Sequence, residues 1–490
     1  IILHSGIFLG GASTAKEIRK ALQSFQQKGK KVYAYNSFFS SRGYYLASVA
    51  DSLFVNESGM VDWTGISIGV TYYKGMLDKI GVKAQAIRGS NNKFKSAVEP
   101  FIQEEMSSSN RKQLETLLND IWSDMLNEIA ASRNLEVDDL QRFADSLAIW
   151  EADDVVRYRL CDGSLHHDEW DSFKENLLEN KAEDKLIGMK AYRKVKSANS
   201  KGFQRDKVAV LYAQGEFTTG DDATTVNPEM MLTSLKEVRE DDNVKALIIR
   251  VNSPGGQAWI ADQMVREIEL IRENIPVVIS MGDVAASAGY MISAVGDTIF
   301  AQENTITGSI GVFGLLFEAQ ELLEEKIGLK TFHINTAAHS DLGTADRPLD
   351  DYERETLQKM IDAYYSHFIE LVAENRSLDK NYIDSIGQGR VWSGLRAIEL
   401  KLADAIGGMG EAEEAARRMA GLDSGAYRIV EFPEEKDPIE ELLKSLENSS
   451  VKLPAALEEG PLAEGYEFYS KWHDLQGVPL MQLEYDIRID

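Results

Sequence analysis

The sequence predicts an α/β protein made of two copies of one unit, with parallel β-sheets and outer helices. Short apolar runs alternate with helical patterns, and segments of the first half recur in the second. The second copy also contains a lone serine among small residues at a strand-to-helix turn. With 490 residues, the chain is long enough for roughly two or three domains, each with its own core.

The internal repeat is the strongest support for this organisation. Four segments recur in the same order at an offset of about 245 residues, which is hard to obtain by chance. The matched pairs are Ile1–Leu3 with Ala246–Ile248, Gly43–Ser58 with Gly289–Asn304, Asp78–Lys83 with Glu325–Lys330, and Ile149–Gly163 with Val391–Ala405.

The second copy shows the alternation of strands and helices most clearly. We predict strands near Ala246–Val251 and Val277–Ser280, a helix near Ala261–Glu273 between them, and a buried helix over Tyr290–Ala294. This order favours parallel strands joined by right-handed crossovers. Two long amphipathic stretches predict outer helices that pack by one face, at Ser107–Arg133 and Asp350–Arg376.

The repeat also sets the expected domain borders. The second copy starts with a strand-like run, Val208–Tyr212, that has no counterpart in the first, so we expect about 40 residues of the first copy to precede Ile1. We expect an N-terminal repeat over residues 1–163, a linker over 164–206, a C-terminal repeat over 207–410 and a C-terminal extension over 411–490. We expect the extension to pack on a partner domain or subunit. The basic end of the linker fits either an anionic lipid surface or a solvated linker.

Composition excludes several classes of function. The net charge of −26 and the pI of about 4.8 argue against a nucleic-acid-binding surface. A single cysteine, Cys161, excludes an internal disulfide framework. The seven histidines lack paired metal-ligand spacing, so we expect no metal site and no cofactor.

The segment Met281–Tyr290 carries the first candidate catalytic residue. Ser287 follows a predicted strand and precedes a predicted helix, among glycines and alanines. Such a turn exposes the serine Oγ while the first backbone N–H groups of the helix point toward the same place. This is the geometry of an acyl-transfer nucleophile. The alternative interpretation is a small-residue turn where a helix and a strand pack closely.

A second turn, Arg250–Gly256, precedes this segment by about thirty residues and follows the neighbouring predicted strand. Pro254 fixes its φ angle, and the glycines allow close backbone approach. A backbone N–H of this turn, together with that of Ala288, would form a two-donor oxyanion hole. By itself the sequence SPGG is simply a favourable turn, but its combination with the serine turn is more specific.

These motifs resemble the signal peptide peptidase A family, also called protease IV, in its long two-repeat bacterial form. The resemblance rests on NSPGG, GDVAASAGY, TGSIG, the tandem repeat and the segment Tyr72–Phe101, and it covers the chain from Ile1 to about Gly410. It implies a repeat unit with the fold shared by the Clp protease proteolytic subunit and the crotonases.

The resemblance assigns roles to individual residues. Ser287 matches the nucleophile of the family, and Lys95 matches its general-base lysine. Gly256 and the N–H of Ala288 match the oxyanion donors, and Ser309 matches the serine that orients the lysine amine. The lysine lies in the first copy and the serine in the second, so each repeat supplies half a site.

The first copy has no complete nucleophile site of its own. Ser41 aligns with Ser287, but Arg42 follows it and no SPGG turn precedes it. Conversely, the second copy has no lysine near His339–Leu342, where the equivalent of Lys95 would lie. Because the half-sites lie on different repeats, we expect a closed oligomer, and the resemblance implies a homotetramer.

A lysine base must have an unusual environment. The pKa of a free lysine is near 10.4, so a lysine that accepts a proton near neutral pH needs its pKa lowered by desolvation. Phe94 and Phe101 flank Lys95 with apolar surroundings that could provide this. Without the resemblance, Lys95 would be read as a surface lysine, and Lys93 is the nearest residue that could be mistaken for the base.

Other readings of the chain remain open from its residues. The run His339-Ser340-Asp341 could supply a histidine base in place of the lysine. A crotonase-type enzyme acting on acyl-CoA thioesters would also use two backbone N–H donors on this fold, although no acidic catalytic pair adjoins either turn. A catalytically inactive scaffold is the third possibility.

The resemblance implies a serine endopeptidase with a Ser–Lys dyad that degrades released signal peptides and other apolar peptides. Its expected location is the bacterial inner membrane with the catalytic part on the periplasmic side, attached through a segment outside this sequence. Residues 285–290 and 308–314 would line an apolar substrate groove.

Overall fold

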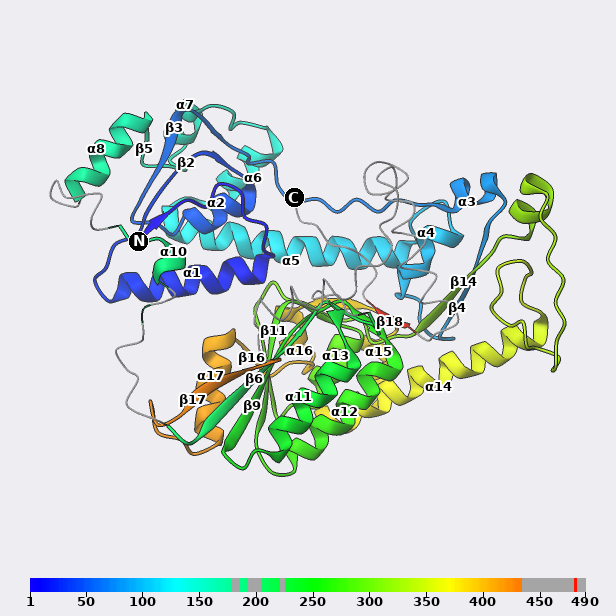
Figure 1. The fold of residues 1–490 in the computed structure, drawn as a ribbon. Helices are drawn as coiled ribbons and strands as arrows, with labels where there is room; N and C mark the ends of the chain where they lie inside the picture. The colour runs from blue at the N-terminus through cyan, green and yellow to red at the C-terminus, as the bar shows by residue number, and fades with distance from the viewer. Residues whose placement is uncertain (178–185, 193–194, 196–203, 221–224, 434–479, 483–490) are drawn as a thin grey trace, which may run out of the picture.

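The computed structural model describes residues 1–490 apart from 178–185, 193–194, 196–203, 221–224, 434–479 and 483–490. Each repeat contains its own sheet, and a third sheet is built from strands of both repeats (Figure 1). Helices cover these sheets, which is the α/β architecture that the sequence predicts.

The sheet of the first repeat is entirely parallel, with the strand order β1-β2-β3-β5. Its strands are β1 (Ile2–Leu3), β2 (Tyr33–Phe39), β3 (Ser52–Val61) and β5 (Gly163–Leu165). The helices around it are α1 (Ala12–Gln27), α2 (Ser41–Ala47), α5 (Ser108–Arg133), α6 (Val137–Asp145), α7 (Ala152–Arg157) and α8 (His167–Leu177). Leu53, Val55 and Ile121 are completely buried in the core of this unit.

The beginning of the predicted linker packs on the first repeat. Trp170 of α8 is almost fully buried, and its ring stacks on Tyr35 of β2 with 4.8 Å between the centroids. A stacked pair of this size buries a large apolar area. We propose that the first repeat therefore extends to about Leu177. The helix α10 (Met189–Tyr192) follows later in the linker.

The sheet of the second repeat has the order β15-β13-β11-β9-β6-β17; in addition, β12 pairs with β11, and β16 pairs with β12. The strands are β6 (Lys207–Gln214), β9 (Val244–Ser253), β11 (Val277–Ala286), β12 (Thr298–Ala301), β13 (Ile306–Gly308), β15 (Val391–Ser393), β16 (Ala405–Ile406) and β17 (Arg428–Phe432). All pairings are parallel except that of β13 with β15. The helices are α11 (Pro228–Glu240), α12 (Ala258–Arg272), α13 (Ala288–Ala294), α14 (Asp351–Arg376), α15 (Lys380–Ile386), α16 (Gly394–Glu399) and α17 (Met409–Met419).

Strand β11 is longer than the sequence predicts. It continues past Ser280 to Ala286, because Ala285 and Ala286 pair with β13 after an irregularity that begins at Met281. Small residues have low intrinsic strand preference, so the pairing with neighbouring strands decides the outcome here. The extension carries the chain directly to Ser287.

The two predicted outer helices are present as α5 and α14. The side chains of Ser107 and Asp350 cap them by accepting hydrogen bonds from the backbone N–H groups of Asn110 and Glu353. Such caps satisfy N–H groups that a helix leaves without intrahelical partners. Within the described residues, no helix combines the length and the hydropathy needed to cross a membrane.

The expected border at residue 410 falls inside α17. This helix packs Ala412, Ala415 and Ala416 against the second sheet, and β17 pairs with β6 beyond it. We propose that the second repeat therefore continues to about Phe432. Most of the predicted C-terminal extension lies outside the described residues. Beyond β17, the structure describes only the strand β18 (Leu480–Gln482) of this extension.

The third sheet joins the repeats, with the order β4-β14-β18-β10-β7-β8. Its other strands are β4 (Lys83–Arg88), β7 (Glu216–Phe217), β8 (Thr225–Val226), β10 (Gly255–Gln257) and β14 (Phe313–Glu318). Strand β4 of the first repeat runs antiparallel to β14 of the second along its whole length. Short helices flank this sheet: α3 (Lys74–Ile80), a 3-10 helix (Ser96–Val98), α4 (Glu99–Ile102) and a π-helix (Leu322–Ile327).

A buried charge cluster also joins the repeats. The Lys16 ammonium lies 2.6 Å from Asp124 of α5 and 3.0 Å from Glu303 of the second repeat. The Lys16 side chain is almost fully buried. Burial raises the pKa of Asp124, and the neighbouring Lys16 ammonium opposes this shift. The Lys16 ammonium thus compensates the negative charge of two carboxylates that are partly removed from water.

We expect Lys16→Met to lower the free energy of unfolding by about 2–4 kcal/mol, because it leaves the partly buried carboxylates of Asp124 and Glu303 without their closest cation. Thermal or urea unfolding at pH 7 measures this loss. Lys236→Met is the control, since Lys236 lies 4.0 Å from Glu240 and both side chains are exposed. It should cost less than about 1 kcal/mol. Equal losses in the two variants would contradict the prediction.

Candidate active site

Three side chains from distant parts of the sequence meet between the repeats. The Lys95 Nζ lies 3.1 Å from the Ser287 Oγ, 2.8 Å from the Ser309 Oγ and 3.4 Å from the Ser309 carbonyl oxygen. Lys95 and Ser287 are 192 positions apart, yet both belong to the same chain. All three residues are fully buried. The structure therefore brings together the predicted nucleophile, base and orienting serine.

Ser287 occupies a sharp turn between β11 and α13. Its φ of 55° and ψ of −116° are unusual for a residue with a side chain. The backbone holds this conformation through two hydrogen bonds: the Ser287 N–H donates to the Gly308 carbonyl, and the Met291 N–H donates to the Ser287 carbonyl. A strained backbone conformation of this kind persists only where the surrounding contacts hold the residue in place.

The two candidate oxyanion donors follow the carboxyl ends of the neighbouring strands β9 and β11. Gly256 lies in β10 with a φ of 148°, and a Cβ there would lie 2.3 Å from the Phe217 carbonyl oxygen. Only glycine fits this position. Ala288 is the first residue of α13, where the helix geometry supplies no intrahelical acceptor for its N–H. The parallel pairing of β9 with β11 brings these two turns to the same edge of the sheet.

Lys95 is held by a loop of the second repeat. Gly389 packs so closely that a Cβ on it would lie 2.5 Å from the Lys95 Cβ and 2.6 Å from its backbone nitrogen. The Phe94 N–H donates to the Gln388 carbonyl. From α5, the Gln113 amide donates to the Phe94 carbonyl and accepts from the Val391 N–H. The lysine is thus positioned by both repeats.

Gly389 and Gln113 were not found from the sequence. A glycine in a GQG loop and a glutamine on an amphipathic helix are common, and only their contacts with the lysine loop reveal their role. Ser309, in contrast, has a distinctive place: its φ is 48°, and its N–H donates to the Arg390 carbonyl. The TGSIG motif is the signal for this turn.

The neighbouring lysine has a different environment. Lys93 is exposed, and its Nζ lies 5.3 Å from the centroid of the Phe94 ring. Beside Lys95, the side chains of Ala97, Val98 and Phe101 are buried in one cluster with Phe313 and Leu315. The structure therefore separates the two lysines clearly, although they are only two residues apart.

The alternative base, His339, is engaged elsewhere. Its Nδ1 lies 3.0 Å from a Glu353 carboxylate oxygen at the start of α14, and its ring stacks on Tyr352. His339, Asp350 and Glu353 are close enough to hold a metal ion, but the Arg347 guanidinium donates to both Glu353 oxygens. These bonds lower the pKa of Glu353 to about 2. A cation already occupies this cluster, which argues against a metal there.

The first copy uses its equivalent turns differently. Gly11, which aligns with Gly256, donates its N–H to the Asp283 carboxylate at 3.2 Å. Asp283 belongs to β11 of the second repeat. The Ser41 hydroxyl, which aligns with that of Ser287, donates to the Asp62 carbonyl. The glycine turn of the first repeat thus binds a carboxylate of the second and holds the strand that leads to Ser287.

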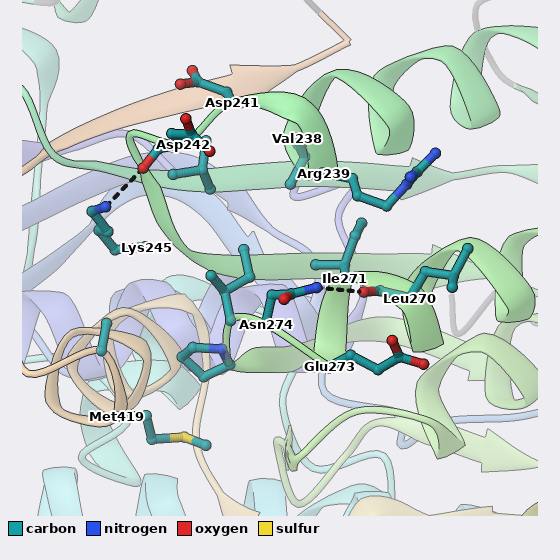
Figure 2. A pocket seen from close by; sticks show the side chains of 14 residues that line it. Val238, Arg239, Asp241, Asp242, Lys245, Leu270, Ile271, Glu273, Asn274 and Met419 are labelled. Carbon is teal, nitrogen blue, oxygen red and sulfur yellow. Dashed lines mark hydrogen bonds between the residues drawn. The ribbon is translucent and has the colours of Figure 1, made fainter.

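A surface hollow of about 750 Å³ lies at the other edge of the second sheet. Figure 2 shows that residues at the start of β9 and just before β11 line it, among them Lys245 and Asn274, together with residues near the ends of α11 and α12. Ser287 instead follows the carboxyl end of β11. The hollow is therefore separate from the candidate active site, and its lining combines apolar side chains such as Leu270 with polar ones such as Asp242 and Asn274.

The chain is similar to a known protein family and to several known proteases. The pattern of peptidase family S49 matches residues 24–177 and 269–423. "Serine protease SPPA, chloroplastic" from Arabidopsis thaliana is 29% identical over 482 residues, covering 95% of this chain and 70% of that protein. "Protease 4" from Salmonella typhi is 30% identical over 470 residues, covering 94% and 75%. "Protease 4" from Haemophilus influenzae is 32% identical over 440 residues, covering 86% and 70%.

A solved structure, a ClpP1 mutant from Listeria monocytogenes, aligns with 41% of this chain and 93% of its own, at 16% identity and a TM-score of 0.29. The family pattern occurs twice, once in each repeat, and the sequence relatives are proteases. The class of protein is thus a peptidase built on a repeated α/β unit. The chain belongs to peptidase family S49. The parallel sheets with outer helices and the two family matches confirm the predicted fold class, and the relatives confirm the resemblance to signal peptide peptidase A in its two-repeat form.

The contact of Gly389 with Lys95 gives a test of the site geometry. Gly389→Ala should slow phosphonylation of Ser287 by a fluorophosphonate about tenfold or more, because the added methyl group displaces the Lys95 backbone and a φ of 80° disfavours alanine. Labelling rates followed by gel fluorescence measure this. Gly75→Ala is the control, since its Cβ would meet nothing within 4 Å. If both variants label at the wild-type rate, Gly389 has no part in positioning the lysine.

Proposed function

We propose that this protein is a serine endopeptidase with a Ser–Lys dyad, in which Ser287 is the nucleophile and Lys95 the general base. The observation that carries the proposal is the 3.1 Å distance between the Lys95 Nζ and the Ser287 Oγ in a fully buried site. A nucleophile within hydrogen-bond distance of a base, which is itself oriented by a third group, is the usual arrangement for covalent catalysis. Ser309 is the orienting group.

The reaction follows from this arrangement. Ser287 Oγ attacks the scissile carbonyl carbon while Lys95 Nζ accepts the hydroxyl proton. The resulting oxyanion accepts hydrogen bonds from the N–H groups of Gly256 and Ala288. Lys95 then donates its proton to the leaving amine, and the acyl group remains on Ser287. Water, deprotonated by the same lysine, releases the acyl group.

The base must be neutral at the start of this cycle. Removal of an amine from water disfavours its charged form, and Lys95 is completely buried. The apolar cluster around Phe101 and Phe313 adds to this environment. The hydroxyl and carbonyl of Ser309 accept hydrogen bonds from the amine and so keep it directed at Ser287.

The expected substrates are released signal peptides and other apolar peptides, cleaved at the bacterial inner membrane on its periplasmic side. The resemblance supports this setting, with membrane association through a segment outside this sequence. We also propose a homotetramer. The dyad itself does not depend on that assembly, because Lys95 and Ser287 meet within one chain.

The alternatives predict different outcomes. A crotonase-type enzyme would bind coenzyme A thioesters, and an inactive scaffold would have a serine that does not react. Membership of a peptidase family favours the peptidase over both. Reaction of Ser287 with an acylating probe separates the peptidase from the scaffold, and calorimetry with coenzyme A tests the crotonase alternative.

We expect Ser287→Ala to abolish labelling by a fluorophosphonate, and Lys95→Met to lower both labelling and peptide hydrolysis by about 10²–10⁴-fold, the usual contribution of a general base. Hydrolysis of a fluorogenic apolar peptide gives the second measurement.

Lys93→Met and His339→Ala are the matched controls, because one removes the adjacent exposed lysine and the other the alternative base. Both should keep activity within about twofold of the wild type. Full activity in Lys95→Met, or its loss in His339→Ala, would contradict the dyad.

A further inference from the structure

One face of the helix α14 contacts the loop that leads to Lys95. The helix packs against β4, and the loop, residues 89–94, follows this strand (Figure 1). Gln358, Asp362 and Tyr365 are spaced by four and three positions, so their side chains lie on one face of the helix. The helix belongs to the second repeat and the loop to the first. This face is therefore a contact between the repeats beside the proposed base.

The first two of these side chains bind the start of the loop. The Gln358 amide donates to the Arg88 carbonyl at 2.8 Å. The Asp362 carboxylate accepts from the N–H and from the hydroxyl of Ser90, each at 2.7 Å. These hydrogen bonds fix the backbone where it leaves β4.

The third side chain, Tyr365, connects both sides of the lysine site. Its hydroxyl donates to one Asp384 oxygen at 2.7 Å, and the other oxygen accepts from the Asn91 amide at 2.6 Å. The same hydroxyl accepts from the Gln388 N–H at 3.0 Å. The Gln388 carbonyl in turn accepts from the Phe94 N–H at 3.0 Å. A ring of hydrogen bonds thus joins the lysine loop to the second repeat at two points, Asn91 and Phe94.

This ring holds the segment that packs on the lysine. Gln388 has a φ of 57°, a left-handed conformation that persists only where the surrounding contacts hold it. The next residue, Gly389, lies so close to the Lys95 backbone that a Cβ would not fit between them. A shift of Gln388 would therefore displace the lysine. Its Nζ would then leave the position 3.1 Å from the Ser287 Oγ.

Tyr365 supports this geometry as a neutral hydroxyl. The residue is only 6% exposed. Burial and the hydrogen bond to Asp384 raise the pKa of Tyr365 above its ordinary value. The hydroxyl therefore remains protonated, and it can donate to Asp384 while it accepts from Gln388.

We propose that Tyr365, acting with Asp384, is a positioning residue for the Ser–Lys dyad. This proposal rests on the proposed peptidase function and adds a residue of α14 to its machinery. A small displacement of a catalytic group is costly, since an error of about 1 Å can lower a rate about a hundredfold. The ring holds the base and not the oxyanion turn, so its loss should affect the chemical step more than substrate binding.

The test uses the full chain with Tyr365→Phe, which removes only the hydroxyl. With a fluorogenic apolar peptide, kcat should fall about tenfold while KM stays within about twofold of the wild type. A fluorophosphonate should label Ser287 about tenfold more slowly but to the same final extent. Tyr382→Phe is the matched control, because Tyr382 lies on α15 like Asp384 and its hydroxyl donates to the Leu400 carbonyl at 3.4 Å. It should keep the wild-type kcat.

Variants of Asp384 test whether the ring acts as one unit. Asp384→Ala should lower kcat about as much as Tyr365→Phe, and the double variant should be no slower than either single variant, since both changes break the same ring. Asp384→Asn should keep kcat within about threefold of the wild type. Its amide oxygen still accepts from Tyr365, and the Asn91 amide can turn its oxygen toward the new N–H group.

The outcomes separate this role from a structural one. Wild-type kcat in Tyr365→Phe would overturn the positioning role and leave the peptidase standing. A smaller final extent of labelling, with an unchanged rate for the chains that react, would also overturn it, because the hydroxyl would then serve only folding. Losses that multiply in the double variant would contradict the ring. A wild-type chain that neither hydrolyses peptides nor reacts at Ser287 would instead contradict the peptidase, and the positioning role with it.

Discussion

A buried amine of one repeat must meet a hydroxyl of the other, and the rest of the structure serves this requirement. Such a contact tolerates little movement, because an amine without its oxygen acceptors would be costly in a dry interior. Three features hold the repeats in register: the pairing of β4 with β14, the buried ion cluster around Lys16, and the helix α5. From α5, Gln113 and Asp120 bind the strand β15 and the helix after it.

The duplication has produced two copies with different tasks. The second copy keeps the glycine turn and the serine, and its sheet carries them to one edge. In the first copy the N–H of Gly11 binds the Asp283 carboxylate, so a turn equivalent to the oxyanion turn now anchors the strand before Ser287. The first copy contributes the lysine in return. Each copy therefore supplies groups that the other lacks, and neither could perform the proposed reaction alone.

Close approach of backbone segments shapes the candidate site. Its glycines allow strands to approach closely, as at Gly256 beside Phe217. The surface hollow at the opposite edge of the sheet has no part in this arrangement, because its lining lies around the starts of β9 and β11.

The sequence by itself determined the repeat, the α/β class and the outer helices, and it supplied Ser287 and Lys95 as candidates, because these depend on local patterns or on motifs shared with a family. Only the tertiary structure decided where β11 ends, that Gly389 and Gln113 position the lysine, and that residues 480–482 lie between β10 and β14. Such features depend on pairing and packing between segments hundreds of residues apart. No local pattern specifies them, since the free energy that selects them arises only when the segments meet.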